Sequence, residues 1–87
     1  MHAIVVRVTI NDPEAGERML REQVVPRVSG APGFVAGYWT RRDDSGMSML
    51  VFESEEAAQA VAGQLESPDA DAVTMEGVEV REVVAHA

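Results

Sequence analysis

The sequence contains no cysteine, so neither a disulfide nor a thiolate metal site can supplement the core of this 87-residue chain. A chain of this length buries only roughly 60% of the surface that its unfolded form exposes, so a lone copy is marginally stable. Oligomerisation is the remaining common supplement. The length argues for one domain spanning residues 1–87.

Positive charge is also scarce. Seven basic residues, all of them arginine, stand against fifteen acidic residues, which gives a net charge of −8. The longest basic run is Arg41-Arg42, which we interpret as a solvated hairpin tip. This balance disfavours nucleic acid and anionic membranes as partners, and it mainly favours solubility.

Long apolar runs are absent as well. No stretch is long enough to span a bilayer, and Arg7 interrupts the apolar N-terminus, which is typical of a strand rather than a signal peptide. We therefore expect a cytoplasmic protein. No phosphate-binding loop, dinucleotide fingerprint, Ser/His/Asp arrangement or metal-binding cluster occurs, so we expect neither cofactor nor metal.

What is present is an alternation of strand and helix signals. Residues 2–10 are rich in Val and Ile, and their alternate positions fall on opposite faces, which predicts a strand. Asp12-Pro13 then provides an N-cap and a first helical residue. Pro26 should end or bend the helix that follows. Further strands are expected at 34–42, 47–53 and 78–85, a second helix after the N-cap Ser54, and a loop at 67–71.

The order βαββαβ with right-handed crossovers predicts an α+β, ferredoxin-like antiparallel sheet of strand order 4-1-3-2 with two helices on one face. A four-residue turn over 43–46 would pair Arg42 with Met47 and place Trp39 opposite Leu50. Directly opposed residues share a face. The helix-facing side would then hold Val35, Gly37, Trp39, Leu50 and Phe52, and the reverse side Tyr38, Thr40, Met47, Met49 and Val51.

The strand at 47–53 is apolar on both sides, whereas a sheet half exposed to water should alternate apolar with polar residues. The helix-free face would be a large apolar patch, which usually marks an interface. We therefore expect a homodimer in which Tyr38, Met49 and Val51 meet a second copy, the two sheets forming a barrel.

Three local patterns carry a family resemblance: Val25-Pro26, Pro32-Gly33-Phe34 leading to Tyr38-Trp39, and the run from Phe52 to Ala58. With the element order, they resemble the dimeric α/β-barrel superfamily, in particular its small antibiotic-biosynthesis-monooxygenase-like proteins. Some such proteins oxidise aromatic substrates with oxygen and no cofactor, others degrade haem on a helix histidine, and others are isomerases or decarboxylases. Neither expected helix here contains a histidine, so the haem-degrading alternative lacks its ligand.

Two aromatic residues are candidates for a site. Trp39, with Phe52 beside it, could wall a pocket and stack on a planar substrate, or simply fill the core beneath the helices. Tyr38 could donate its hydroxyl to a substrate oxygen, or it could pack in the dimer interface.

The polar candidates also have two interpretations each. Arg7 could hold an anionic or enolate substrate, or it could pair across the dimer with Glu53 or Glu82, or lie solvated at the rim of the interface. Asn11 could bond a substrate carbonyl, or shape a turn. The two histidines, His2 and His86, could meet and bind a metal, or remain solvated at the chain ends.

The leading hypothesis is a cofactor-independent monooxygenase acting on a planar organic substrate, with Trp39, Tyr38, Arg7 and Asn11 as candidate catalytic residues. The alternatives are a non-catalytic dimer that binds a small aromatic or hydrophobic ligand or has a structural role, and an isomerase or decarboxylase. A pocket of roughly 300 Å³ or more beside Trp39 would favour the enzyme, and a closed core would favour the structural role.

Overall fold

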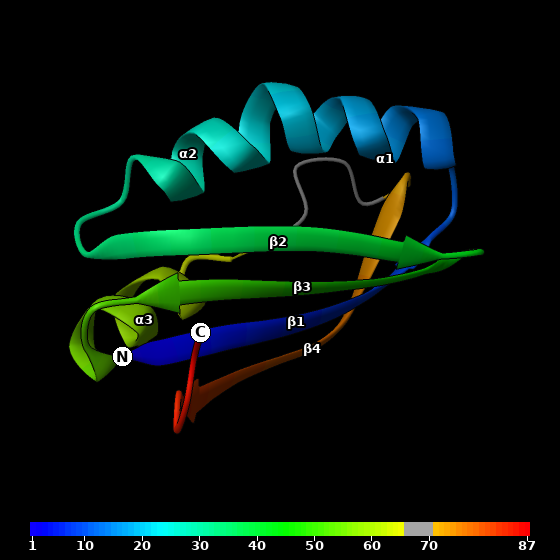
Figure 1. Cartoon of the computed structure of the whole chain (residues 1–87). Helices are drawn as coiled ribbons and strands as arrows, with labels where there is room; N and C mark the ends of the chain where they lie inside the picture. Colours follow the sequence, from blue (N-terminus) through cyan, green and yellow to red (C-terminus); the bar gives the residue numbers. More distant parts are fainter. Residues whose placement is uncertain (66–70) are drawn as a thin grey trace.

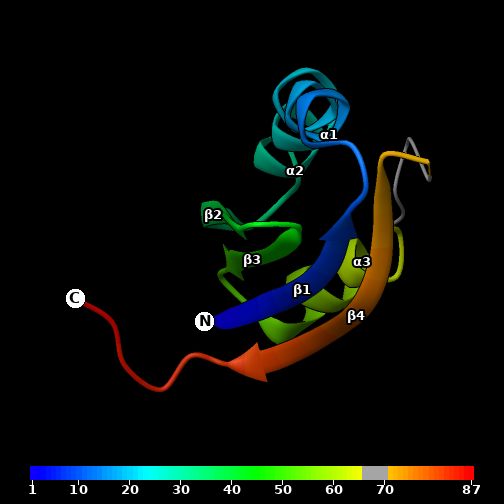
Figure 2. The same ribbon diagram turned by 90° about the vertical axis from the view of Figure 1, so that its right-hand side faces the viewer.

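The computed structural model describes residues 1–65 and 71–87 and forms a small α+β fold. Its single antiparallel sheet has the order β2-β3-β1-β4, which is 4-1-3-2 when read from the β4 edge, and it is compatible with a ferredoxin-like fold. All the helical segments lie on one side of this sheet (Figures 1 and 2). The strands are β1 (His2–Ile10), β2 (Phe34–Arg42), β3 (Ser45–Phe52) and β4 (Val73–Glu82). The helical segments are α1 (Pro13–Met19), the π-helical turn η1 (Leu20–Val24), α2 (Val25–Ser29) and α3 (Glu55–Ala62).

The first helix begins as expected. The Asp12 side chain accepts a hydrogen bond from the Ala15 backbone N–H at 3.1 Å, and Pro13 is the first helical residue. Pro26 does not end the helix, which continues to Ser29. Because Pro26 cannot donate to the carbonyl four residues back, the chain accommodates it with the wider turn η1 immediately before α2.

The β2–β3 hairpin is tighter than the sequence suggested. Arg42 pairs with Ser45, not with Met47, so the expected four-residue turn is wrong. Asp43 adopts the left-handed conformation with a φ of 55°, which Asp tolerates better than most residues, and this permits a two-residue turn. Because the error is two residues, Trp39 still lies on the helix-facing side, but it pairs with Ser48.

A bulge at the start of β2 overturns the expected position of Val35. The register shifts between Phe34 and Ala36, so Phe34 pairs with Phe52 and their rings meet edge to face, with centroids 5.8 Å apart. The extra residue of the bulge is Val35, which is exposed rather than under the helices.

The fourth strand was expected at 78–85 but runs from Val73 to Glu82. A register shift leaves Glu76 as an extra residue, because Arg7 pairs with Gly77 and Val8 with Met75. This irregularity breaks the period-2 pattern by which the start of the strand would have been detected. Most of the expected 67–71 loop lies outside the described residues.

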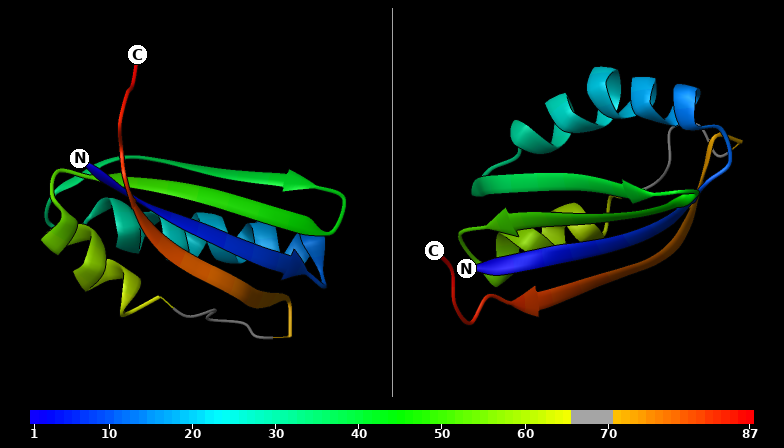
Figure 3. Two further views of the ribbon diagram at one scale, coloured as in Figure 1. Left: turned by 90° about the horizontal axis from the view of Figure 1, so that it is seen from below. Right: turned by 45° about the vertical axis from the view of Figure 1, so that its right-hand side comes forward.

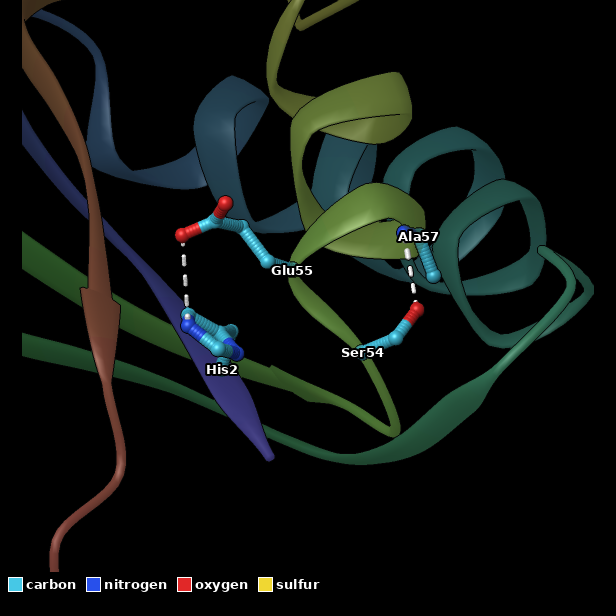
Figure 4. A network of polar contacts seen from close by, with 4 residues as sticks. All are labelled: His2, Ser54, Glu55 and Ala57. Carbon is cyan, nitrogen blue, oxygen red and sulfur yellow. Dashed lines mark hydrogen bonds and ion pairs between the residues drawn. The ribbon is translucent and has the colours of Figure 1, made fainter.

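The core lies between the sheet and the helices. Ile4, Leu50 and Phe52 are fully buried there. On α3, Ala58 is also fully buried, as expected for a helix whose alanines allow close approach to the sheet. The Ser54 hydroxyl caps α3 by accepting a hydrogen bond from the Ala57 N–H at 3.1 Å (Figure 4).

Candidate functional site

A cavity of about 310 Å³ lies between the helix-facing side of the sheet and the α1–η1 segment. On the covered side of the sheet, α2 lies against β2 and α3 against β1, β3 and β4 (Figure 2). All four strands contribute to the walls of the cavity. Its apolar lining includes Val6, Val8, Leu20, Val24, Leu50 and Met75.

The register of the sheet explains why Trp39 lies at this cavity. Trp39 on β2, Ser48 on β3 and Val6 on β1 are cross-strand neighbours, so their side chains share the helix-facing side. All three residues line the cavity. The half-buried indole of Trp39 therefore forms a flat aromatic wall.

The next row of the sheet extends the cavity towards the hairpin. It contains Arg41, Gly46 and Val8, which also line the cavity. Gly46 is buried, and a Cβ atom added there would lie 2.6 Å from the Val8 Cγ2 atom. Only glycine fits this position without displacing Val8, so the floor of the cavity depends on it.

Three polar side chains stand out among the cavity residues. The Glu17 carboxylate, from α1, lies 2.6 Å from the Arg21 guanidinium, which balances its charge. Across residues 1–65 and 71–87, Arg41 makes no ion pair and the Ser48 hydroxyl makes no hydrogen bond. Thr40 belongs to the hairpin itself, since its hydroxyl donates to the Met47 carbonyl at 2.6 Å.

The structure brings only one of the proposed catalytic residues to this cavity. Trp39 lines it, whereas Phe52 is fully buried in the adjacent core. Tyr38 and Arg7 lie on the opposite, helix-free side of the sheet. Asn11 joins β1 to β4, because its side-chain amide donates to the Thr74 hydroxyl at 2.9 Å.

The helix-free face carries exposed apolar side chains. Tyr38 is 67% exposed and Met47 50%, and Met49, which is 46% exposed, lies between Tyr38 on β2 and Val5 on β1. Val51 is half-buried in the next row. We call this surface the open face; Figure 3 shows the sheet from two further directions.

Charged residues border the open face on the β4 side. The Glu79 carboxylate accepts a hydrogen bond from the Arg81 Nε at 2.8 Å. This bond and the Arg81 charge hold the pKa of Glu79 below its usual value, and the Arg7 charge acts in the same direction. The Arg7 guanidinium lies over Gly77 and forms no ion pair with an acidic side chain of residues 1–65 and 71–87 of its own chain. Its expected pairing with Glu53 or Glu82 across a dimer stays a prediction.

The two histidines have different surroundings. His2 Nε2 lies 3.4 Å from the Glu55 carboxylate (Figure 4), and its Nδ1 is buried without a hydrogen-bond partner. His86 is exposed in the C-terminal tail. No group of three or more histidine or acidic side chains within the described ranges is placed to hold a metal ion. No helix in the same ranges has the length and apolarity to cross a membrane.

Sequence reasoning missed three cavity residues. Arg41 was interpreted as a solvated tip, and Ser48 and Glu17 were not singled out. Ser48 left a detectable signal, because it is the one side chain with a hydroxyl among the inward positions 46, 48, 50 and 52 of β3. In comparisons with known proteins, no protein family and no curated protein matches this chain.

Proposed function

We propose that this protein binds a small, planar, largely apolar organic molecule in the cavity beside Trp39. The observation that carries the proposal is the cavity itself. Its volume of about 310 Å³ lies at the lower end of the range of roughly 300–1,000 Å³ found for ligand pockets. A mostly apolar lining with a few polar groups is the usual composition of such pockets.

In this proposal, the side chains that line the cavity contact different parts of the ligand. The Trp39 indole stacks on the flat body of the ligand. The Ser48 hydroxyl, next to Trp39 in the same row, hydrogen-bonds a polar atom of the ligand, since it lacks a partner within the described part of the chain. The apolar side chains from β1 and η1 exclude water from the ligand.

A titration with naphthalene-2-carboxamide tests this proposal. The chain has one tryptophan, so the indole N–H of Trp39 gives a single signal in a two-dimensional NMR spectrum. We expect this signal to shift saturably in the wild type. Ser48→Leu, which fills the floor of the cavity, should abolish the shift, whereas Ser45→Leu, the same change at the exposed start of β3, should not. An indole signal in the wild type that neither this amide nor its charged analogues with the same ring system move would refute ligand binding here.

For the reaction, we propose cofactor-independent monooxygenation, supported by the family resemblance and by the size of the cavity. A base removes a proton from an activated CH₂ group, and the carbanion reacts with O₂. One oxygen atom becomes the new carbonyl oxygen and the other leaves as water, so the substrate itself supplies the electrons. Glu17 is the carboxylate that lines the cavity, and it is the candidate base.

Oxygen uptake with dihydroxy-aromatic compounds, whose keto tautomers carry such an activated CH₂ group, tests this reaction. We expect wild-type uptake to fall in Trp39→Ala, which loses the stacking wall, and in Glu17→Gln, which loses the base. Equal turnover in wild type and Trp39→Ala would remove Trp39 from the site. Binding without oxygen uptake would favour the non-catalytic alternative, and turnover that does not depend on oxygen would favour an isomerase or decarboxylase.

We also propose that two copies pair through their open faces, with Tyr38, Met49 and Val51 in the interface. The exposure of Tyr38 and Met49 on the helix-free side of the sheet supports this, because large contiguous apolar patches are unusual on proteins that stay monomeric. A second copy offers the same apolar surface, and a two-fold axis makes such a surface self-complementary.

A further inference from the structure

The Arg41 side chain adds a positive charge to one end of the mostly apolar cavity. Arg41 and Trp39 are alternate residues of β2, so both project from the helix-facing side. Two residues of a strand span roughly 7 Å. The indole leans towards Gly37, where an added Cβ atom would lie 3.0 Å from its Cη2 and Cζ3 atoms. A flat ligand that stacks on the indole must therefore extend along β2 by more than this two-residue spacing to reach the guanidinium.

Arg41 is available to a ligand. No ion pair engages it anywhere in residues 1–65 and 71–87, although the chain carries more than twice as many acidic as basic residues. Its neighbour across the hairpin in the same row is Gly46, which offers no side chain to compete for the guanidinium.

The other charged group of the cavity does not compete with this assignment. Glu17 would favour a cation, but the Arg21 guanidinium lies 2.6 Å from its carboxylate and already balances it. The net charge of −8 opposes an anion only at long range, since salt screens exposed charges over about 8–10 Å. At contact distance, the charge of Arg41, which has no ion-pair partner in the described part of the chain, outweighs this long-range repulsion.

We propose that the ligand is a planar aromatic carboxylate, whose anionic group is bound by Arg41 while its rings lie against Trp39. This inference rests on the proposed binding function and names the class of ligand. A guanidinium presents two parallel N–H donors that match the two oxygens of a carboxylate, and such charge-assisted bonds are stronger than neutral ones.

Three probes with one ring system test the charge requirement: naphthalene-2-carboxylate, naphthalene-2-carboxamide and naphthalen-2-ylmethylammonium. The shift of the Trp39 indole signal reports binding of each. We expect the carboxylate to bind the wild type about tenfold more tightly than the neutral amide, and the ammonium to bind most weakly. Arg41→Gln should reduce the preference for carboxylate over amide to about one.

Arg42→Gln is the matched control. It removes the same charge from the adjacent residue, which pairs with Ser45 and does not line the cavity, so the preference for carboxylate should persist. Three results would overturn the role of Arg41 and leave the binding function standing. They are equal affinity of the wild type for carboxylate and amide, tightest binding of the ammonium, and an equal effect of the two variants. If no probe moves the indole signal, the binding function itself is wrong.

Discussion

The substitution Met49→Glu tests whether the open face joins two copies. Met49 lies in the middle of this face, between Tyr38 on β2 and Val5 on β1. Residues at the centre of an interface usually carry most of its binding energy. A carboxylate at this position would stand in solvent in a single chain, but it would have to be desolvated in a dimer, so the substitution should act on association more than on folding.

The expected magnitude follows from the exposure of Met49. Complete burial of a Met side chain is worth about 1.5–3 kcal/mol, and 46% of Met49 is exposed in the single chain. About half of that free energy, roughly 0.7–1.4 kcal/mol, is then gained on association. A two-fold interface contains the residue twice. Met49→Glu should therefore raise the dissociation constant at least about tenfold, before the desolvation of the carboxylate is added.

Sedimentation velocity over a series of concentrations measures this change. The control is Gln59→Glu, which adds the same charge on the exposed side of α3, on the opposite side of the sheet. Circular dichroism should show that both variants remain folded. The reasoning fails if the wild type sediments at the single-chain mass of 9.4 kDa at micromolar concentration, or if Met49→Glu associates as tightly as the wild type.

Substitutions at three further positions test the fold. Phe52→Ala should lower the free energy of unfolding by about 3–5 kcal/mol in urea titrations, since Phe52 is fully buried; a loss below 1 kcal/mol would contradict its place in the core. Ser54→Ala should cost about 1 kcal/mol and Ser54→Asp much less, because Asp can also cap α3 through the Ala57 N–H. For Glu79, the lowered pKa means that its pair with Arg81 stabilises the fold above the usual value of 4.5 and is lost as the pH falls through the lowered value. Glu79→Gln should thus lower the melting temperature at neutral pH and have no effect in strong acid; equal effects at both would refute this.

The parts of the fold that the sequence predicted are those set by hydrophobic period. Alternation along residues 2–10 predicted a strand, in which Ile4 is fully buried, and alternation in the third strand placed Leu50 and Phe52 on the helix-facing side, where both are fully buried. Where a strand has no bulge, side-chain direction depends only on whether a position is odd or even. An error of two residues in the hairpin register therefore left these faces unchanged.

The parts that could not be predicted depend on single backbone conformations. The left-handed conformation of Asp43 decides between a two-residue and a four-residue turn, and the sequence Asp43-Asp44-Ser45-Gly46 is compatible with both. The bulge that turns Val35 outward has no signature in composition. The cavity was unpredictable for a different reason, because it depends on the space between a helix and the sheet rather than on any one motif.

The sizes of the side chains account for this space. α3 presents alanines and packs closely, with Ala58 fully buried. The α1–η1 segment presents the larger Leu20 and Val24, while the sheet beneath it offers the small Gly46 and Ser48. If this mismatch leaves room for a ligand, Ser48→Leu should fill it, and the gain from burying a Leu, less some strain, should stabilise the fold by about 1 kcal/mol.

In a domain of this size, such a gain corresponds to a melting temperature about 4–8 °C higher. Ser48→Leu should therefore be more stable than the wild type and yet unable to bind the naphthalene probes, which is the usual conflict between stability and a functional cavity. Ser45→Leu, on the exposed start of β3, should change neither property. A large loss of stability in Ser48→Leu would mean that the space is already filled in solution, and a cavity that closes in this way could not serve as a preformed binding site.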